Sequence, residues 1–313
     1  MAESAFFCPL THEGVLAVRG TDAGTFLQGQ LTCNIQYLAG RASLGARCTP
    51  KGRMQSSFRI LPQGDGFLMA MAGELVEPQL ADLKKYAVFS RGTRLADESA
   101  QWARFGLRNG DAPLAVLGLN LPAEANALLE ADGMLAVRLS DGRAELWAPA
   151  EHATRVQASL AAQLPEAPLN DWLLAQVRAG VGQVFGATRE LFIPQMINLQ
   201  ALDGVSFRKG CYAGQEIVAR MQYLGRLKRR MHRLAVSVET VPEPGTELFS
   251  PVHGSSVGEV VLAARAAGQI EVLAVVQQDA LEDGRLHLEN TQGPALQPLD
   301  LPYGLDSERE IQR

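Results

Sequence analysis

The chain carries the run Lys209-Gly210-Cys211-Tyr212-Ala213-Gly214-Gln215-Glu216, which places one thiol among cations and glycines. Arg208 and Lys209 precede the cysteine, and residues 217–221 after the loop have the pattern of a helix or a strand. Cations and a helix N-terminus both stabilise a thiolate, so Cys211 is a candidate reactive cysteine. The alternative is a small buried hydrophobe in an ordinary turn. The concentration of Cys, Gly, Gln and Glu in one loop favours the functional interpretation.

Glu216 is the second candidate site residue. A carboxylate beside a glycine-rich loop can accept a planar N–C–N donor edge in bidentate fashion, as pterins and guanidines present. The alternative is a solvated glutamate in a first helical turn, paired with Arg220 four residues later. Trp172 has two interpretations as well: a core residue of an amphipathic helix, or a flat platform for an aromatic heterocycle.

The bulk properties narrow the class of protein. A chain of 313 residues exceeds what one hydrophobic core serves, so we expect two or three domains. The net charge of -5 provides no global attraction to nucleic acid or anionic membrane. Residues 226–233 form a basic run, either a solvated strand edge or an electropositive wall beside an anionic ligand. No apolar run approaches the roughly twenty residues that span a bilayer, and residues 1–11 lack a signal-peptide pattern, so we expect a cytoplasmic protein.

The metal-binding residue types are scattered. Cys8, Cys33, Cys48 and Cys211 form no C-x-x-C pair, so the sequence indicates neither a disulfide framework nor a zinc site. Their spacing matches no common iron–sulfur ligand pattern. The chain also lacks a nucleophile elbow, a P-loop and a dinucleotide-binding glycine motif after a strand. We therefore expect no metal site.

Periodicity and turn residues predict two α+β units followed by an all-β unit, an α+β class with mainly antiparallel sheets. In the first two units we expect strands at 44–49, 54–61, 67–71 and 103–107, a hairpin over 134–148, and helices over 75–89, 113–130 and 151–164. Short strands separated by Gly and Pro over 234–288 predict a small, partly closed β-barrel. The expected domains are 1–100, which can interleave with the second, 101–228 with the cysteine loop, and 229–313.

Several segments carry a resemblance to a known family. They are Phe26-Leu27-Gln28-Gly29-Gln30-Leu31-Thr32, Lys51-Gly52-Arg53-Met54, Leu83-Lys84-Lys85-Tyr86-Ala87-Val88-Phe89-Ser90, Ile193-Pro194-Gln195, and the octet at 209–216 followed by Val218-Ala219-Arg220. Nearly end to end, the chain resembles the YgfZ group of folate-binding proteins, which are relatives of the glycine-cleavage aminomethyltransferase (T-protein). The octet with its cysteine distinguishes this group from true aminomethyltransferases.

The resemblance implies a T-protein-like three-domain ring around a folate channel, closed by the C-terminal barrel. It implies tetrahydrofolate or another reduced folate as ligand, and a role in assembling or repairing iron–sulfur enzymes, including those that modify tRNA. The implied catalytic residues are Cys211 and Lys209. The implied folate-binding residues are Glu216 at the pterin, Trp172 stacked near it, Gln215, Tyr212 and Gly214, with Arg226, Arg229 or Arg230 at the folate tail.

The implied partners are folate and iron–sulfur enzymes or their assembly proteins. The negative net charge and the lack of an RNA-binding module argue against direct tRNA contact, and we expect neither DNA nor membrane binding. Gln79 stands where aminomethyltransferases carry a folate-orienting aspartate, although Asp82 is near, which argues against one-carbon transfer by their mechanism. Glu13-Gly14-Val15 stands where some YgfZ proteins have a tryptophan, so one wall of the pocket can differ.

Three functions remain open at the level of the sequence. The first is a folate-dependent accessory protein, possessing or lacking a transferase activity, in which Cys211 attacks a one-carbon unit or holds iron or sulfur. The second is an aminomethyltransferase of the glycine-cleavage type, and the third a non-catalytic, folate-gated scaffold.

Overall fold

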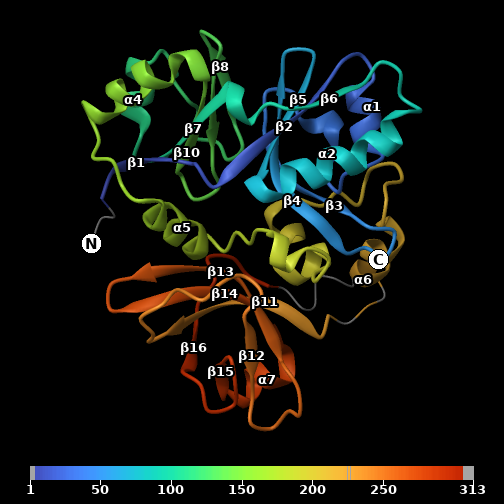
Figure 1. The fold of residues 1–313 in the computed structure, drawn as a ribbon, viewed down its shortest axis with the longest axis vertical. Coiled ribbons are helices and arrows are strands. Elements are labelled where there is room, and N and C mark those ends of the chain that lie inside the picture. The colour runs from blue at the N-terminus through green and yellow to red at the C-terminus, as the bar shows by residue number, and fades with distance from the viewer. Residues whose placement is uncertain (1–3, 224, 226, 306–313) are drawn as a thin grey trace. The chain divides into compact units, whose positions relative to one another are not determined.

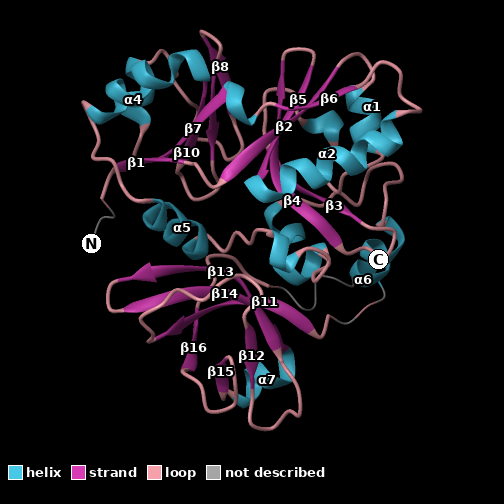
Figure 2. Cartoon of the chain, viewed as in Figure 1, coloured by secondary structure: helices cyan, strands magenta, loops and turns pink. Residues whose placement is uncertain are grey.

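The computed structural model describes residues 4–223, 225 and 227–305. Within these residues the strands form two five-stranded antiparallel sheets and one closed six-stranded barrel, with helices packed on the sheets (Figures 1 and 2). The expected α+β class with mainly antiparallel sheets is confirmed. The barrel is closed rather than partly closed, because its last strand pairs with its first.

The first sheet has the order β1-β7-β10-β9-β8. Its strands are β1 Phe6–Pro9, β7 Trp102–Arg108, β10 Ala144–Pro149, β9 Met134–Arg138 and β8 Leu128–Ala131. Helices α3 Asp111–Val116 and α4 Ala153–Ala161 bury Leu114 and Val156 in its core.

The predicted helix over residues 113–130 is wrong. It ends after Val116 because Gly118 adopts φ +80, a left-handed conformation that closes a helix at low cost. Pro122 then lacks the N–H that a continuing helix needs. Leu128–Ala131 instead pairs with β9 as a strand, a tertiary contact that local periodicity does not report.

The second sheet has the order β3-β4-β5-β2-β6. Its strands are β3 Ser43–Cys48, β4 Met54–Gln63, β5 Gly66–Ala72, β2 Glu13–Arg19 and β6 Arg94–Asp97. Helix α1 Ala23–Gln28 follows β2, and helix α2 Gly73–Ala87 buries Val76 and Leu83. The expected strands and helix of this region are confirmed, apart from ends that differ by one to two residues.

The barrel has the order β11-β14-β13-β12-β15-β16. Its elements are β11 Arg229–Val236, β12 Glu247–Phe249, β13 Gly258–Ala266, β14 Gln269–Gln277, α7 Gln278–Asp283, β15 Leu286–Leu288 and β16 Ala295–Leu299. A register shift between Val260 and Leu262 interrupts the pairing of β13 with β14, as a β-bulge does where a sheet bends to close.

Two longer helices and six short 3-10 helices complete the described elements. They are α5 Leu169–Arg178, α6 Gln215–Tyr223, η1 Ile35–Tyr37, η2 Ser99–Gln101, η3 Ala150–His152, η4 Gly186–Thr188, η5 Pro194–Ile197 and η6 Leu199–Leu202. In the described part of the chain, every helix is too short or too polar to cross a membrane.

Tertiary contacts divide the chain into two units. The first comprises Met1–Gly29, Asn34–Leu44 and Phe58–Trp172, and the second comprises Gln30–Cys33, Gly45–Ser57 and Leu173–Arg313. The cysteine loop at 209–216 therefore shares a unit with two segments from the beginning of the chain. The expected boundaries at 100/101 and 228/229 stay a prediction.

Candidate functional site

The loop at 209–216 ends in helix α6, and a glycine contact fixes that junction. Gly214 adopts φ +83, and a Cβ there would lie 2.5 Å from the Thr49 carbonyl oxygen and 3.1 Å from Cys48 Cβ. Across the contact, Gly52 adopts φ +71, and a Cβ there would lie 2.9 Å from Ile217 Cβ. Both positions therefore require glycine twice over, for conformation and for space. The β3–β4 turn thereby seats the start of α6.

Lys209 anchors the other end of the loop. Its Nζ donates to the carbonyl oxygens of Leu31 at 2.6 Å and Cys33 at 2.7 Å, and it lies 5.1 Å from the centroid of the Tyr212 ring. Burial lowers the pKa of the Lys209 ammonium to about 8, although the nearby Cys33 opposes the shift. The side chain thus donates its hydrogen bonds to backbone oxygens of Gln30–Cys33, a segment nearly 180 residues earlier in the chain.

Cys211 is exposed, whereas Cys8, Cys33 and Cys48 are buried. Burial raises the pKa of the Cys8 thiol to about 11, of the Cys33 thiol to about 11 and of the Cys48 thiol to about 12. These three thiols are therefore held in the neutral, unreactive form at neutral pH. Of the four cysteines, Cys211 alone combines solvent access with a loop that is pinned at both ends.

Tyr212 points inward from the same loop. The residue is 7% exposed, and among the described residues its hydroxyl oxygen has no hydrogen-bond partner. Burial raises the pKa of this phenol, and Cys48 and Cys33 add to the rise, so the group stays neutral. Gln195 of η5 supports helix α6, which follows the loop, because its Nε2 donates to the Val218 carbonyl oxygen at 2.7 Å.

Gln215 and Glu216 begin α6, so the helical alternative for this segment is confirmed. The Glu216 side chain is 84% exposed and lies 3.7 Å from Arg220 Nη2, which is itself 64% exposed. A surface pair of this kind contributes at most about 1 kcal/mol. The carboxylate is thus accessible and weakly held, even though the expected i, i+4 pair with Arg220 is present.

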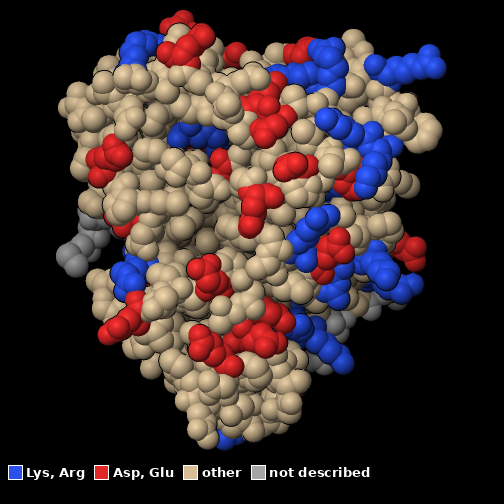
Figure 3. Space-filling model, in the orientation of Figure 1, with Lys and Arg blue, Asp and Glu red and all other residues tan. Residues whose placement is uncertain are grey.

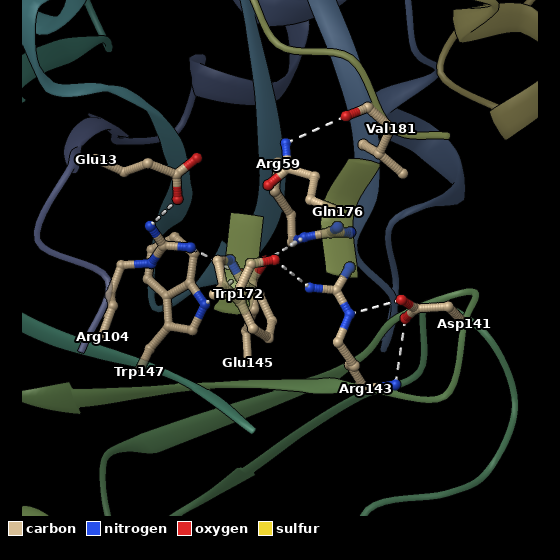
Figure 4. A network of polar contacts seen from close by, with 10 residues as sticks. All are labelled: Glu13, Arg59, Arg104, Asp141, Arg143, Glu145, Trp147, Trp172, Gln176 and Val181. Carbon is tan, nitrogen blue, oxygen red and sulfur yellow. Dashed lines mark hydrogen bonds and ion pairs between the residues drawn. The ribbon is translucent and has the colours of Figure 1, made fainter. Parts of the chain in front are cut away.

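Trp172 belongs to the first unit and is packed there, only 3% exposed. The Arg143 guanidinium covers its ring, with Cζ 4.1 Å from the ring centroid, and Arg143 Nε also donates to Asp141 at 2.6 Å (Figure 4). A Cβ on Gly106 would lie 2.4 Å from the Trp172 ring, so the ring rests on the backbone of β7. Within this unit the indole is a core side chain, in agreement with the structural alternative.

The three arginines named for the folate tail differ in their settings. Arg226 lies outside the described residues. Arg229 forms an ion pair with Glu259 on β13, and Arg230 is 9% exposed. From Arg229 onwards the basic run is therefore built into barrel strand β11 rather than left as a uniform solvated edge.

Several supporting groups had no role assigned from the sequence. The carbonyls of Leu31, Cys33 and Thr49 contact the loop, and backbone carbonyls leave no signal in residue type. Gln195, which supports α6 through Val218, and Gly52 were named only within segments of the family resemblance. The described part of the chain holds no group of three or more His, Cys, Asp or Glu side chains that could bind a metal ion.

Comparison with known proteins identifies the class of the fold. No protein-family model matches the chain. The glycine cleavage system aminomethyltransferase T from Bartonella henselae superposes with a TM-score of 0.71 at 14% identity, over 98% of this chain and 87% of that one. The architecture is therefore that of the T-protein class.

Sequence relatives narrow the class to a family. The tRNA-modifying protein YgfZ of Sodalis glossinidius is 35% identical over 300 residues, which is 93% of this chain and 90% of the relative. That of Serratia proteamaculans is 35% identical over 311 residues, 94% of this chain and 91% of the relative. The chain belongs to the YgfZ family, and the resemblance found in its sequence is confirmed.

Proposed function

We propose that this protein supports tRNA modification as an accessory protein for iron–sulfur enzymes, using a reduced folate and the thiol of Cys211. The observation that carries the proposal is the contrast among the cysteines: Cys211 is exposed and the other three are buried. A single accessible thiol in a fixed loop is the arrangement expected of a nucleophile, or of a transient ligand for iron or sulfur. The names of the relatives supply the link to tRNA.

Lys209 contributes to this site by position. Its Nζ is hydrogen-bonded to two carbonyl oxygens, so it holds the loop that carries Cys211 at a fixed place on Gln30–Cys33. Gly214 fixes the other end of the loop against Thr49 and Gly52. We therefore assign Lys209 and Gly214 to the placement of the thiol and Cys211 to the chemistry.

A reduced folate fits the second unit through Glu216. The carboxylate is 84% exposed and could accept the paired N–H groups of a pterin edge. Tyr212 offers a buried hydroxyl without a partner among the described residues, and Gln215 adds an amide in the same helical turn. Trp172 and Arg229 fit less well, because Arg143 covers the ring and Glu259 pairs the arginine. When bound, the folate would supply a one-carbon carrier or a binding signal.

The test is tetrahydrofolate binding by calorimetry on the wild type, Glu216→Ala and Cys211→Ser. Arg220→Ala is the matched control, because it removes the partner of Glu216 and leaves the carboxylate. We expect Glu216→Ala to weaken binding at least about 10-fold, as loss of a charge-assisted hydrogen bond does. Cys211→Ser and Arg220→Ala should bind nearly as the wild type does.

The thiol is tested in cells that lack the family member and are complemented with each variant, with thiolated nucleosides in tRNA measured by mass spectrometry. We expect Cys211→Ser to fail and Cys8→Ser to restore the modification. Full complementation by Cys211→Ser would remove the thiol from the proposal, and a wild-type protein that binds no reduced folate would remove the folate.

A further inference from the structure

The segment from the end of α2 to the start of β6 exposes an aromatic side chain that the proposed function does not use. Phe89 is 91% exposed, Val88 is 67% exposed and Tyr86 is 45% exposed. They lie on the last turn of α2 and the turn that follows it, all within the first unit. Neighbouring exposed apolar side chains, unlike a single scattered one, can mark an interaction site.

Cations lie close to this aromatic group in the sequence. Lys84, Lys85, Arg91 and Arg94 fall between residues 84 and 95, a stretch without a carboxylate. Lys85 pairs with Asp82 at 3.1 Å and Arg94 with Asp65 at 2.8 Å, whereas Lys84 and Arg91 form no ion pair with any described residue. Figure 3 shows Lys and Arg side chains gathered at the right of the view, around the end of α2. The net charge of -5 therefore conceals a locally basic surface.

The turn that carries Phe89 is held in place. The Gly92 N–H donates to Asp22 Oδ2 at 3.0 Å, and the hydroxyls of Ser90 and Thr93 are 2.7 Å apart. A Cβ on Gly92 would lie 2.5 Å from Thr21 Oγ1, so the turn is packed against the start of α1. Phe89 is thus presented by a fixed turn, which lowers the entropy lost when a partner covers it.

The size and composition of this surface point to single-stranded nucleic acid. A stable protein partner buries about 800 Å² on each side, and two strongly exposed side chains do not supply such an area. One aromatic ring and a few cations also give only marginal membrane binding. An unpaired base on the ring with phosphates on the cations needs no more than this surface offers.

We propose that Phe89, Lys84 and Arg91 form a contact surface for an unpaired loop of tRNA, with a base stacked on Phe89 and phosphates at Lys84 and Arg91. This inference rests on the proposed function, since the relation to tRNA comes from it. It departs from the expectation of no direct tRNA contact, which used the net charge and the lack of an RNA-binding module and not the local charge at this surface.

The test is the affinity of the purified full-length protein for an in vitro transcribed tRNA, measured by fluorescence anisotropy at several salt concentrations without folate. Phe89→Ala should lower the affinity roughly 5- to 150-fold, the range for loss of one base–aromatic stack. Lys84→Ala combined with Arg91→Ala should reduce the slope of log affinity against log salt by about 1.4, or about 0.7 for each lost phosphate contact.

Two exposed residues of the first unit provide matched controls. Val116 is 68% exposed on α3, and Arg155 lies exposed on α4; Val116→Ala and Arg155→Ala should leave both the affinity and the slope unchanged. Thermal melting of every variant checks that the fold is retained. Glu216→Ala and Cys211→Ser should bind tRNA as the wild type does, so failure of the folate or thiol proposal remains distinguishable from failure of this one.

Two results would overturn the proposal. The first is a tRNA affinity that Phe89→Ala leaves unchanged; if tRNA modification is nevertheless lost in Phe89→Ala cells, the surface is assigned to a protein partner. The second is Phe89-dependent binding to vesicles of phosphatidylglycerol and phosphatidylcholine that exceeds binding to tRNA, which would assign the surface to a membrane.

Discussion

Gly214 and Gly210 lie on either side of Cys211, but they differ in conformation and in the space around them. Gly214 has φ +83, and a Cβ placed there would clash with the Thr49 carbonyl oxygen at 2.5 Å, whereas nothing lies within 4 Å of a Cβ placed on Gly210. We expect Gly214→Ala to destabilise the protein by about 2 kcal/mol or more, from left-handed strain plus the clash. Gly210→Ala is the control and should change stability by less than about 0.5 kcal/mol. Urea unfolding measures both, and equal losses would contradict this account of the loop.

Lys209 gives the loop a pH dependence. Burial lowers the pKa of its ammonium to about 8 from its ordinary value of 10.5. The unfolded chain therefore binds more protons than the folded one between about pH 8 and 10.5, so this group makes the free energy of unfolding rise with pH in that window. Lys209→Met removes the titration. The free energy of unfolding of the wild type minus that of the variant should increase from pH 8 to pH 10.5. A difference that does not change with pH would show that the amine is not desolvated.

At the scale of elements, one buried carboxylate joins strands of two sheets within the first unit. Glu145 on β10 accepts from Arg104 of β7 at 2.7 Å and from Arg59 of β4 at 3.0 Å, as Figure 4 shows. Burial by itself raises the pKa of Glu145, but Arg59 and Arg104 outweigh it and lower the pKa to about 2. The carboxylate is therefore charged at all ordinary pH values, and its stabilisation is lost only as pH falls below 4.5 towards 2.

Glu145→Gln removes the anion that Arg59 pairs with and one of the two anions of Arg104, which keeps Glu13. We expect it to destabilise the protein by about 3–5 kcal/mol, the usual result of removing one member of a buried ion pair. Glu130→Gln, at the exposed position of β8, is the matched control and should lower the free energy of unfolding by less than about 0.5 kcal/mol. Thermal unfolding distinguishes the two. A small effect at Glu145 would mean that water reaches the guanidinium groups.

At the scale of the whole molecule, most strands and helices follow from the sequence. Strands β3, β4 and β5 of the second sheet and most barrel strands alternate or cluster their apolar residues between Gly and Pro turns, and these strands were predicted. The helix over 113–130 was wrong, and β1, β6, β8 and β16 were not predicted. Each of these four strands has only four or five residues. So short a segment carries too few positions for a period, and its pairing with distant strands decides its structure.

The candidate site divides in the same way. The sequence by itself determined the family, the loop that carries Cys211 and the carboxylate that follows it, because residue identity at close spacing is a local property. Only the tertiary structure decided that Cys211 is the exposed cysteine, that Lys209 binds the carbonyls of Leu31 and Cys33, and that Trp172 lies under Arg143. The exposure of Cys211 and the packing of Trp172 depend on which side chains cover them, and the contacts of Lys209 join segments more than a hundred residues apart. The physical reason is that the local pattern of a chain does not record which distant segments it will contact.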